Sequence, residues 1–313
     1  LQVLSMKIFG INEFAARFPN AICGFLTLSF LFYLGNKHFN KKIAWYWVLA
    51  YLGSFTPHFY FKSGIIDPFF NLFIFAGIYQ LYLASIKMET SRLRNFLFAG
   101  LFLGLAVLTK GPVALLVSGL SGLVYLIINR KKGLWFNFKD LLVLALAVLS
   151  ISFFWFGLET IKNGPFFLEK FILYQIDLFK NPVASHGQPF YYHPLVLLVG
   201  CFPISILALQ WFFKPQRGEG ESAIFILWMQ ILFWVVLILF SIVKTKIVHY
   251  SSLCYPPLTF FAALMMDRLI NRGEGLKPWA KKLILGIGLL FAVIFILIPL
   301  SGANEGIKNL IMG

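Results

Sequence analysis

Ten long apolar runs, separated by short polar segments, constrain the fold of this chain more than any other feature. Most contain 16 to 21 residues, and they fall at 19–36, 42–59, 67–86, 95–109, 111–128, 140–157, 192–212, 223–243, 251–267 and 282–301. A helix rises 1.5 Å per residue, so about 20 residues cross a hydrocarbon core of ~30 Å. The alternating segments of a membrane β-barrel are absent from the sequence. We therefore predict an all-α, polytopic transmembrane helical bundle with about ten membrane helices, in which residues 1–313 form one transmembrane domain.

Composition agrees with a membrane protein and argues against a nucleic-acid-binding one. The chain is 59% hydrophobic with a mean hydropathy of +0.82, which excludes an ordinary soluble domain. Its net charge of +15 could suggest nucleic acid as a partner. The lysines and arginines are instead dispersed among the loops between apolar runs, a pattern that sets membrane topology. We expect no nucleic-acid partner, and we interpret Cys23, Cys201 and Cys254, which lie in apolar runs, as packing residues.

The distribution of cations between alternate loops predicts the orientation. One set of loops holds 17 lysines and arginines, and the other holds 10. Cytoplasmic loops carry the excess of such residues, so the first set, which includes Lys131, is predicted to be cytoplasmic. The second set then faces outward and contains Lys7, Arg17, Lys62, Lys110, Lys162, Lys170, Lys180, Lys244, Lys246 and Lys308.

One outward loop is long, at residues 157–191. Within it, apolar side chains recur at Phe167, Phe171, Tyr174 and Leu178, a helical spacing of three to four. This pattern predicts an extracytoplasmic loop with an interfacial helix that lies on the outer leaflet.

Lys110 stands at the end of one apolar run and is followed directly by Gly111 and Pro112. Proline cannot continue a helix interior and glycine permits a tight reversal, so this stretch predicts a helical hairpin with an ammonium group at its tip. The lysine can snorkel toward the headgroups, or it can bind the phosphate of a ligand. Both interpretations remain open from the residues alone.

Two further outward segments carry carboxylates at helix ends. Asp67 opens an apolar run, directly before Pro68, and can cap the helix, orient a substrate or hold a metal. Glu13 and Arg17 are four residues apart and face each other in a helix, either as an interfacial ion pair or as part of a binding site.

The last candidate segments lie late in the chain. Lys244 and Lys246 are two residues apart, so in an extended segment both would face one ligand, although a solvated loop is the alternative. We expect these lysines and Lys110 to line one cavity, with Asp67 on its rim. His186 opens an aromatic stretch, and we favour an ordinary loop histidine over a metal ligand there. The sequence shows no diagnostic metal motif, phosphate-binding P-loop or dinucleotide fingerprint.

Five of these stretches, in this order, resemble one family. They run from Phe9 to Pro19, Ile66 to Pro68, Leu108 to Pro112, His186 to Tyr192 and Lys246 to Tyr250. They resemble the polyprenyl-phosphate-sugar-dependent glycosyltransferases of the GT-C class, which contains dolichyl-phosphate-mannose protein mannosyltransferases and bacterial aminoarabinose lipid A transferases. The resemblance is closest to the bacterial branch. It implies an integral protein of the bacterial inner membrane, with an active site that faces the periplasm.

The resemblance implies an inverting transfer of a sugar from a polyprenyl-phosphate carrier to a lipid, glycan or protein acceptor. Asp67 is then the catalytic residue within this chain, where it places the acceptor or the sugar, or holds a divalent metal. The residues expected to bind the donor phosphate are Lys110, Lys244, Lys246 and Arg17. Those expected to contact substrate are Glu13, Lys62, His186, Tyr191, Tyr192, His249 and Tyr250.

The chain also departs from the pattern of this family. Such enzymes carry an acidic outward loop, which supplies the usual catalytic base, and a Lys-Pro-Pro element before the stretch that matches Phe9 to Pro19. We therefore expect a fragment that is inactive on its own. A transporter of lipids or polyisoprenoids is the alternative, and it would favour internal repeats and ionisable groups near the membrane midplane. Here the charges gather at helix ends, which favours the glycosyltransferase.

Overall fold

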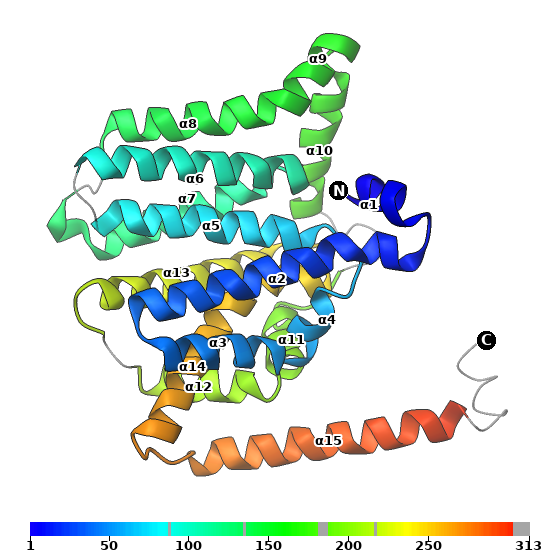
Figure 1. Ribbon diagram of the computed structural model, residues 1–313, viewed down its shortest axis with the longest axis vertical. Coiled ribbons are helices and arrows are strands. Elements are labelled where there is room, and N and C mark those ends of the chain that lie inside the picture. The colour runs from blue at the N-terminus through cyan, green and yellow to red at the C-terminus, as the bar shows by residue number, and fades with distance from the viewer. Residues whose placement is uncertain (87–88, 134–135, 181–186, 216–217, 303–313) are drawn as a thin grey trace.

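The computed structural model describes residues 1–86, 89–133, 136–180, 187–215 and 218–302, and it shows a bundle of long helices (Figure 1). Over these ranges there is no β-strand, and Gly187 and Thr245 form an isolated antiparallel bridge. The predicted all-α class is therefore confirmed.

From α2 to α8, and again from α13 to α15, successive long helices run in alternating directions along the bundle (Figure 1). These are α2 (Glu13–His38), α3 (Lys41–Leu52), α5 (Asp67–Ile86), α6 (Glu89–Lys110), α7 (Val113–Ile128), α8 (Phe138–Ser152), α13 (Gly220–Ile242), α14 (Tyr255–Asn271) and α15 (Pro278–Gly302). The start of α5 and the end of α6 consequently meet at one end of the bundle, which we call the Asp67 end. The opposite end, where α6 and α8 begin, is called the far end.

Shorter helices complete the chain. They are α1 (Gln2–Phe9), α4 (Phe55–Tyr60), α9 (Leu158–Asn163), α10 (Phe166–Lys180), α11 (Tyr192–Gly200) and α12 (Ile204–Phe213), with a π-helical turn at Phe153–Gly157 and 3₁₀ segments at Arg130–Lys132 and Val248–Cys254. The helix predicted in the long loop is thus present as α10. Its position on a membrane leaflet remains a prediction.

Each of the ten predicted apolar runs contains helix, but fewer than ten helices are long enough to cross a membrane. Seven helices of the described chain meet that criterion, and an eighth does if α11 and α12, which meet at 117°, count as one span. The run at 42–59 is interrupted by Gly53 and Ser54 between α3 and α4, and α7 has only 16 residues. Counting apolar residues cannot detect such interruptions, which explains the higher predicted number.

Asparagine side chains cap the N-termini of several helices. Asn12 accepts a hydrogen bond from the Ala15 amide at the start of α2, and Asn40 accepts one from the Ile43 amide at the start of α3. Asn137 and Asp140 form a reciprocal capping box on α8. These caps satisfy amide groups that would otherwise lack partners in the first turn, and so they fix where each helix begins.

Small residues let α6 and α8 approach closely. A Cβ atom added at Gly100 would lie 2.6 Å from the Leu144 carbonyl oxygen, and one added at Gly104 would lie 2.8 Å from the Ile151 Cβ. Glycines spaced four apart are typical of close helix pairs in membranes, where packing rather than hydrophobic burial drives association. Both α6 and α8 line the second of the two cavities described below.

Candidate active site

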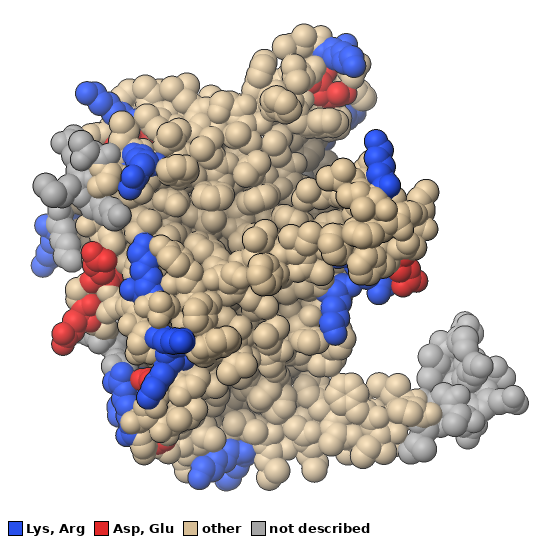
Figure 2. Space-filling model, in the orientation of Figure 1, with Lys and Arg blue, Asp and Glu red and all other residues tan. Residues whose placement is uncertain are grey.

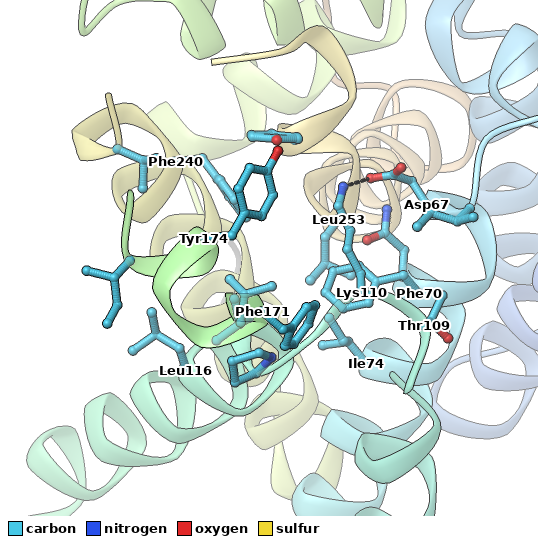
Figure 3. Close-up of a pocket in the computed structure, with 18 of the residues that line it drawn as sticks. Asp67, Phe70, Ile74, Thr109, Lys110, Leu116, Phe171, Tyr174, Phe240 and Leu253 are labelled. Atoms are coloured by element: carbon cyan, nitrogen blue, oxygen red, sulfur yellow. Dashed lines mark hydrogen bonds and ion pairs between the residues drawn. The ribbon is translucent and has the colours of Figure 1, made fainter. Parts of the chain in front are cut away.

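A cavity of about 620 Å³ opens at the Asp67 end (Figure 3). It lies between α5, α6, α7, α10, α13 and the 3₁₀ segment Val248–Cys254, which is called the 3₁₀ segment below. Most of its wall is apolar, from residues such as Phe70, Ile74, Leu116, Phe171 and Leu253. Among its lining residues the charged side chains are Asp67 and Lys110. A cavity of this size with few polar groups is typical of a small-molecule site.

Asp67 is the first residue of α5 and its side chain is almost fully buried. Its Oδ1 accepts a hydrogen bond of 2.5 Å from Lys110 Nζ, and its Oδ2 lies 3.7 Å from His249 Nε2. A buried carboxylate is tolerated only when it is paired, and here the lysine supplies the opposite charge. The carboxylate that could have capped a helix therefore contacts two side chains from distant parts of the chain.

Lys110 ends α6, and the backbone reverses directly after it. Gly111 adopts a φ of +101°, in the left-handed region that favours glycine, and α7 begins two residues later. The ammonium lies 4.6 Å from the centre of the Tyr250 ring, which is a cation–π distance. Lysine has three N–H donors, and the bond to Asp67 uses one of them. The side chain lines the cavity with its ammonium on Asp67, a geometry that differs from that of a lysine snorkelling toward headgroups.

A layer of neutral polar side chains fixes the elements that carry these charges. Asn71, one turn after Asp67 on α5, donates 2.7 Å hydrogen bonds to Tyr60 and Ser252. Ser252 in turn donates to the Tyr60 hydroxyl at 3.1 Å. These bonds tie α5 to the 3₁₀ segment, and so they set the position of His249 opposite Asp67. Sequence reasoning missed these three residues, although the amide of Asn71 inside an apolar run was a usable signal.

The expected convergence of lysines is only partly present. Lys244 is exposed and Lys246 is 4% exposed, and neither lines the cavity. Lys246 Nζ donates a 2.7 Å hydrogen bond to the Val243 carbonyl oxygen, three residues back. The backbone bends at Val243 and Lys244 before the bridged Thr245, which leaves Lys244 exposed and Lys246 buried. The prediction of two lysines facing one cavity was therefore wrong. Burial, together with the charge of Lys244, lowers the pKa of Lys246.

Five other predicted residues that the structure describes lie away from the cavity lining. Glu13 and Arg17 form the expected ion pair at 3.3 Å, but both side chains are largely exposed, so the pair contributes little to stability. Lys62 is exposed, with its ammonium 5.4 Å from the centre of the Phe59 ring. Tyr191 is exposed and Tyr192, at the start of α11, is partly buried. His186 and Lys308 lie outside the described residues.

A divalent metal finds little support in this geometry. In the part of the chain that the structure describes, no group of three or more His, Cys, Asp and Glu side chains is placed to hold a metal ion. Asp67 and His249 supply two ligand atoms, but the carboxylate is already bonded to an ammonium group. We therefore derive no chemical step through a metal.

Known proteins resemble this chain in sequence. Residues 1–155 match the family model of the dolichyl-phosphate-mannose-protein mannosyltransferases. An uncharacterized protein of Aquifex aeolicus is 33% identical over 267 residues, which are 85% of this chain and 58% of that protein. The undecaprenyl phosphate-alpha-4-amino-4-deoxy-L-arabinose arabinosyl transferase of Edwardsiella ictaluri is 27% identical, over 99% of this chain and 57% of that protein.

Solved structures share the fold. The crystal structure of ArnT from Cupriavidus metallidurans bound to undecaprenyl phosphate matches 93% of this chain and 52% of that protein, with a TM-score of 0.77 and 21% identity. In sequence, the chain is similar to polyprenyl-phosphate-sugar-dependent glycosyltransferases of the GT-C class. The resemblance stated from its sequence motifs is thereby confirmed. The chain spans a little over half the length of these relatives.

Proposed function

We propose that this protein transfers a sugar from a polyprenyl-phosphate carrier to a lipid, glycan or protein acceptor. The observation that carries the proposal is the Asp67–Lys110 pair at the edge of an apolar cavity of about 620 Å³. A polyprenyl phosphate is an anionic head on a hydrocarbon tail, and the cavity offers a cation next to an apolar wall. The relatives support this choice, because several are named as undecaprenyl phosphate arabinosyl transferases.

Lys110 is proposed to stabilise the leaving phosphate. When the bond between the anomeric carbon and the phosphate oxygen breaks, its electron pair stays on the phosphate, which gains negative charge. A cation placed in advance stabilises that charge more than it stabilises the substrate, and so it lowers the barrier. Two N–H donors of Lys110 remain for phosphate oxygens while the third stays on Asp67.

Asp67 is proposed to orient the acceptor and to hold Lys110. Its Oδ1 is engaged by the ammonium, while its Oδ2, at 3.7 Å from His249, is available to a hydroxyl group of the acceptor or the sugar. His249 and Tyr250 would then border the reacting groups. Five further predicted residues near the Asp67 end are proposed to contact substrate outside the cavity lining; they are Glu13, Arg17, Lys62, Tyr191 and Tyr192. A substrate contact is also proposed for His186, from its position in the sequence alone.

The Asp67 end is proposed to face the outside of a bacterial inner membrane, with the 157–191 loop on the same side. The excess of cations in the alternate loops at the far end, 17 against 10, supports this orientation. Figure 2 shows basic side chains along the far end of the bundle, at the left, with fewer at the right.

Binding of undecaprenyl phosphate by the purified chain in nanodiscs, measured by native mass spectrometry, tests the proposal. Lys110→Ala removes a charge-assisted contact worth about 1.5–3 kcal/mol, so affinity should fall roughly 10- to 200-fold. The control is Lys131→Ala at the far end, which should bind like the wild type. Unchanged affinity in Lys110→Ala would remove Lys110 from the proposed site.

Sugar transfer is measured on the complete reading frame that carries this sequence. Asp67→Asn should lower turnover while undecaprenyl phosphate still binds, because the asparagine leaves the Lys110 charge without a competing carboxylate. A variant that loses binding and turnover together would assign Asp67 to donor binding instead.

The bent pair of α11 and α12 favours the transporter alternative, because transporters use broken helices. One measurement distinguishes the glycosyltransferase from the transporter, namely the movement of labelled polyprenyl phosphate across the membrane of sealed proteoliposomes. Movement without any sugar transfer would support the transporter.

A further inference from the structure

A second cavity, of about 530 Å³, lies on the other face of α7, between that helix and α5, α6 and α8. The residues of α7 that line it recur every three to four positions, at Leu115, Gly119, Gly122 and Leu126, whereas the active-site cavity contacts Leu116 of the same helix. The two cavities are therefore separated by α7, and the second extends toward the far end.

Hydrocarbon lines almost all of this second cavity. The one lining side chain with a polar group is Ser118, and its hydroxyl already donates to the carbonyl oxygens of Ala114 and Leu115. A polar ligand would find, among the lining side chains, only the acceptor lone pairs of the Ser118 hydroxyl. A hydrocarbon chain would gain dispersion contacts that an empty cavity lacks.

The cavity opens on the outer surface of the bundle. Leu123 and Leu149 belong to its lining and are 51% and 62% exposed. The span that contains α8 is only 11% buried, so this surface faces the hydrocarbon of a bilayer. The chains that can enter the cavity are therefore those of membrane lipids.

Gly119 keeps this space open. Glycine inside a helix costs about 1 kcal/mol relative to alanine, so it needs a structural reason. For Gly100 the reason is contact with α8, but a Cβ atom added at Gly119 would meet nothing within 4 Å. Packing inside the bundle therefore does not require Gly119. Its effect is to leave volume in the cavity.

Basic side chains are concentrated at the far end of the bundle, where α6 and α8 begin. Residues 91–139 contain no acidic residue, and Asp140 is paired with Arg92 at 2.8 Å. Arg94 and Lys139 are exposed, and each lies two residues from a side chain of the lining, Phe96 and Leu141 respectively. Positive charge at the end of the bundle where Phe96 and Leu141 lie complements an anionic headgroup, while the apolar interior complements its tail.

We propose that this cavity binds one hydrocarbon chain of an anionic membrane phospholipid, whose headgroup phosphate contacts Arg94 and Lys139. The site is separate from the proposed glycosyltransferase cavity, and it would persist if that function were wrong. Its ligand comes from the leaflet at the far end, where the cations lie.

Photo-crosslinking in nanodiscs tests the proposal. The probe is phosphatidylglycerol with a diazirine in one acyl chain, and peptide mass spectrometry should locate adducts on the lining residues of α7 and α8. Gly119→Leu fills the cavity and should lower this labelling about tenfold, a change of about 1.4 kcal/mol. The matched control is Gly286→Leu in the lipid-facing helix α15, where an added Cβ atom also meets nothing within 4 Å.

The headgroup contribution is tested by the same probe with a choline headgroup, which should label the cavity less. The double variant Arg94→Gln and Lys139→Gln should reduce labelling by the glycerol lipid to the level of the choline lipid. Gly119→Ala leaves most of the cavity and favours the helix, so it should still be labelled and shows that the fold tolerates substitution there.

Three results would overturn the proposal. If the Gly119→Leu variant were labelled as strongly as the wild type, no acyl chain would enter the cavity. Equal labelling by the glycerol and choline lipids would show that the cavity does not select an anionic headgroup. Protection by added undecaprenyl phosphate would assign the cavity to the tail of the sugar donor.

Discussion

Removing either partner of the Asp67–Lys110 pair should destabilise the fold, and removing both should cost less than the two single changes together. Asp67 is held inside the protein by one ion pair and by a longer contact to His249. Lys110→Met keeps an apolar side chain of similar length but leaves the carboxylate without its main partner. In the double variant with Asp67→Asn, no charge remains to be compensated.

The magnitude follows from the burial of the two groups. Removing one partner of a buried pair costs roughly 3–5 kcal/mol. The Lys110 side chain is 25% exposed, so water can reach the pair, and we expect about 2–3 kcal/mol for Lys110→Met. Asp67→Asn keeps a hydrogen-bonding group and should cost about 1–2 kcal/mol. The costs of neighbouring residues are not additive, and we expect a coupling of about 1–2 kcal/mol.

The assay is reversible unfolding by sodium dodecyl sulfate in mixed micelles, followed by tryptophan fluorescence, for the wild type and the three variants. The control is the exposed pair Glu13–Arg17, where the same cycle should give a coupling near zero. Strictly additive costs at Asp67 and Lys110 would refute the reasoning, because they would mean that the two side chains do not hold each other in the folded protein.

Three other predictions concern topology, packing and acid stability. A cysteine at position 244 in place of Lys244 should react with a membrane-impermeant reagent added outside intact cells, and one in place of Lys131 should not; the reverse pattern would invert the orientation. Gly100→Leu should lower the unfolding free energy by about 1–3 kcal/mol or more, because its side chain would meet the backbone of α8, and an unchanged value would contradict the close approach. The pKa of Glu274 is held below its usual value by hydrogen bonds from Arg268, so its stabilisation is present above the unfolded pKa and is lost as pH falls through the folded one. Thermal unfolding between pH 6 and pH 3 should show this loss in the wild type and less of it in Glu274→Gln.

The placement of Lys110 and Asp67 at one end of the bundle could be predicted, because the lengths of the apolar runs determine which helix ends lie on the same side. The bond between them could not, since the residues are 43 positions apart and their approach depends on how α5 and α6 pack. The same holds for Asn71 and Ser252, whose hydrogen bonds cross between distant elements.

Local backbone geometry explains the other differences. Lys246 turns back to the Val243 carbonyl, and a spacing of two residues says nothing about such a turn. The run at 192–212 is largely apolar, yet the chain bends by 117° near Pro203, the residue directly before α12. Hydrophobicity alone identifies the helices well and locates breaks within them poorly.

The position of the phosphate in a complex with undecaprenyl phosphate tests the central claim most directly. A cryo-electron microscopy structure of the protein in nanodiscs with this lipid should place a phosphate oxygen within hydrogen-bond distance of Lys110 Nζ, with the tail along Phe70, Ile74 and Leu116. A phosphate bound elsewhere, with Lys110 still contacting only Asp67, would contradict the account.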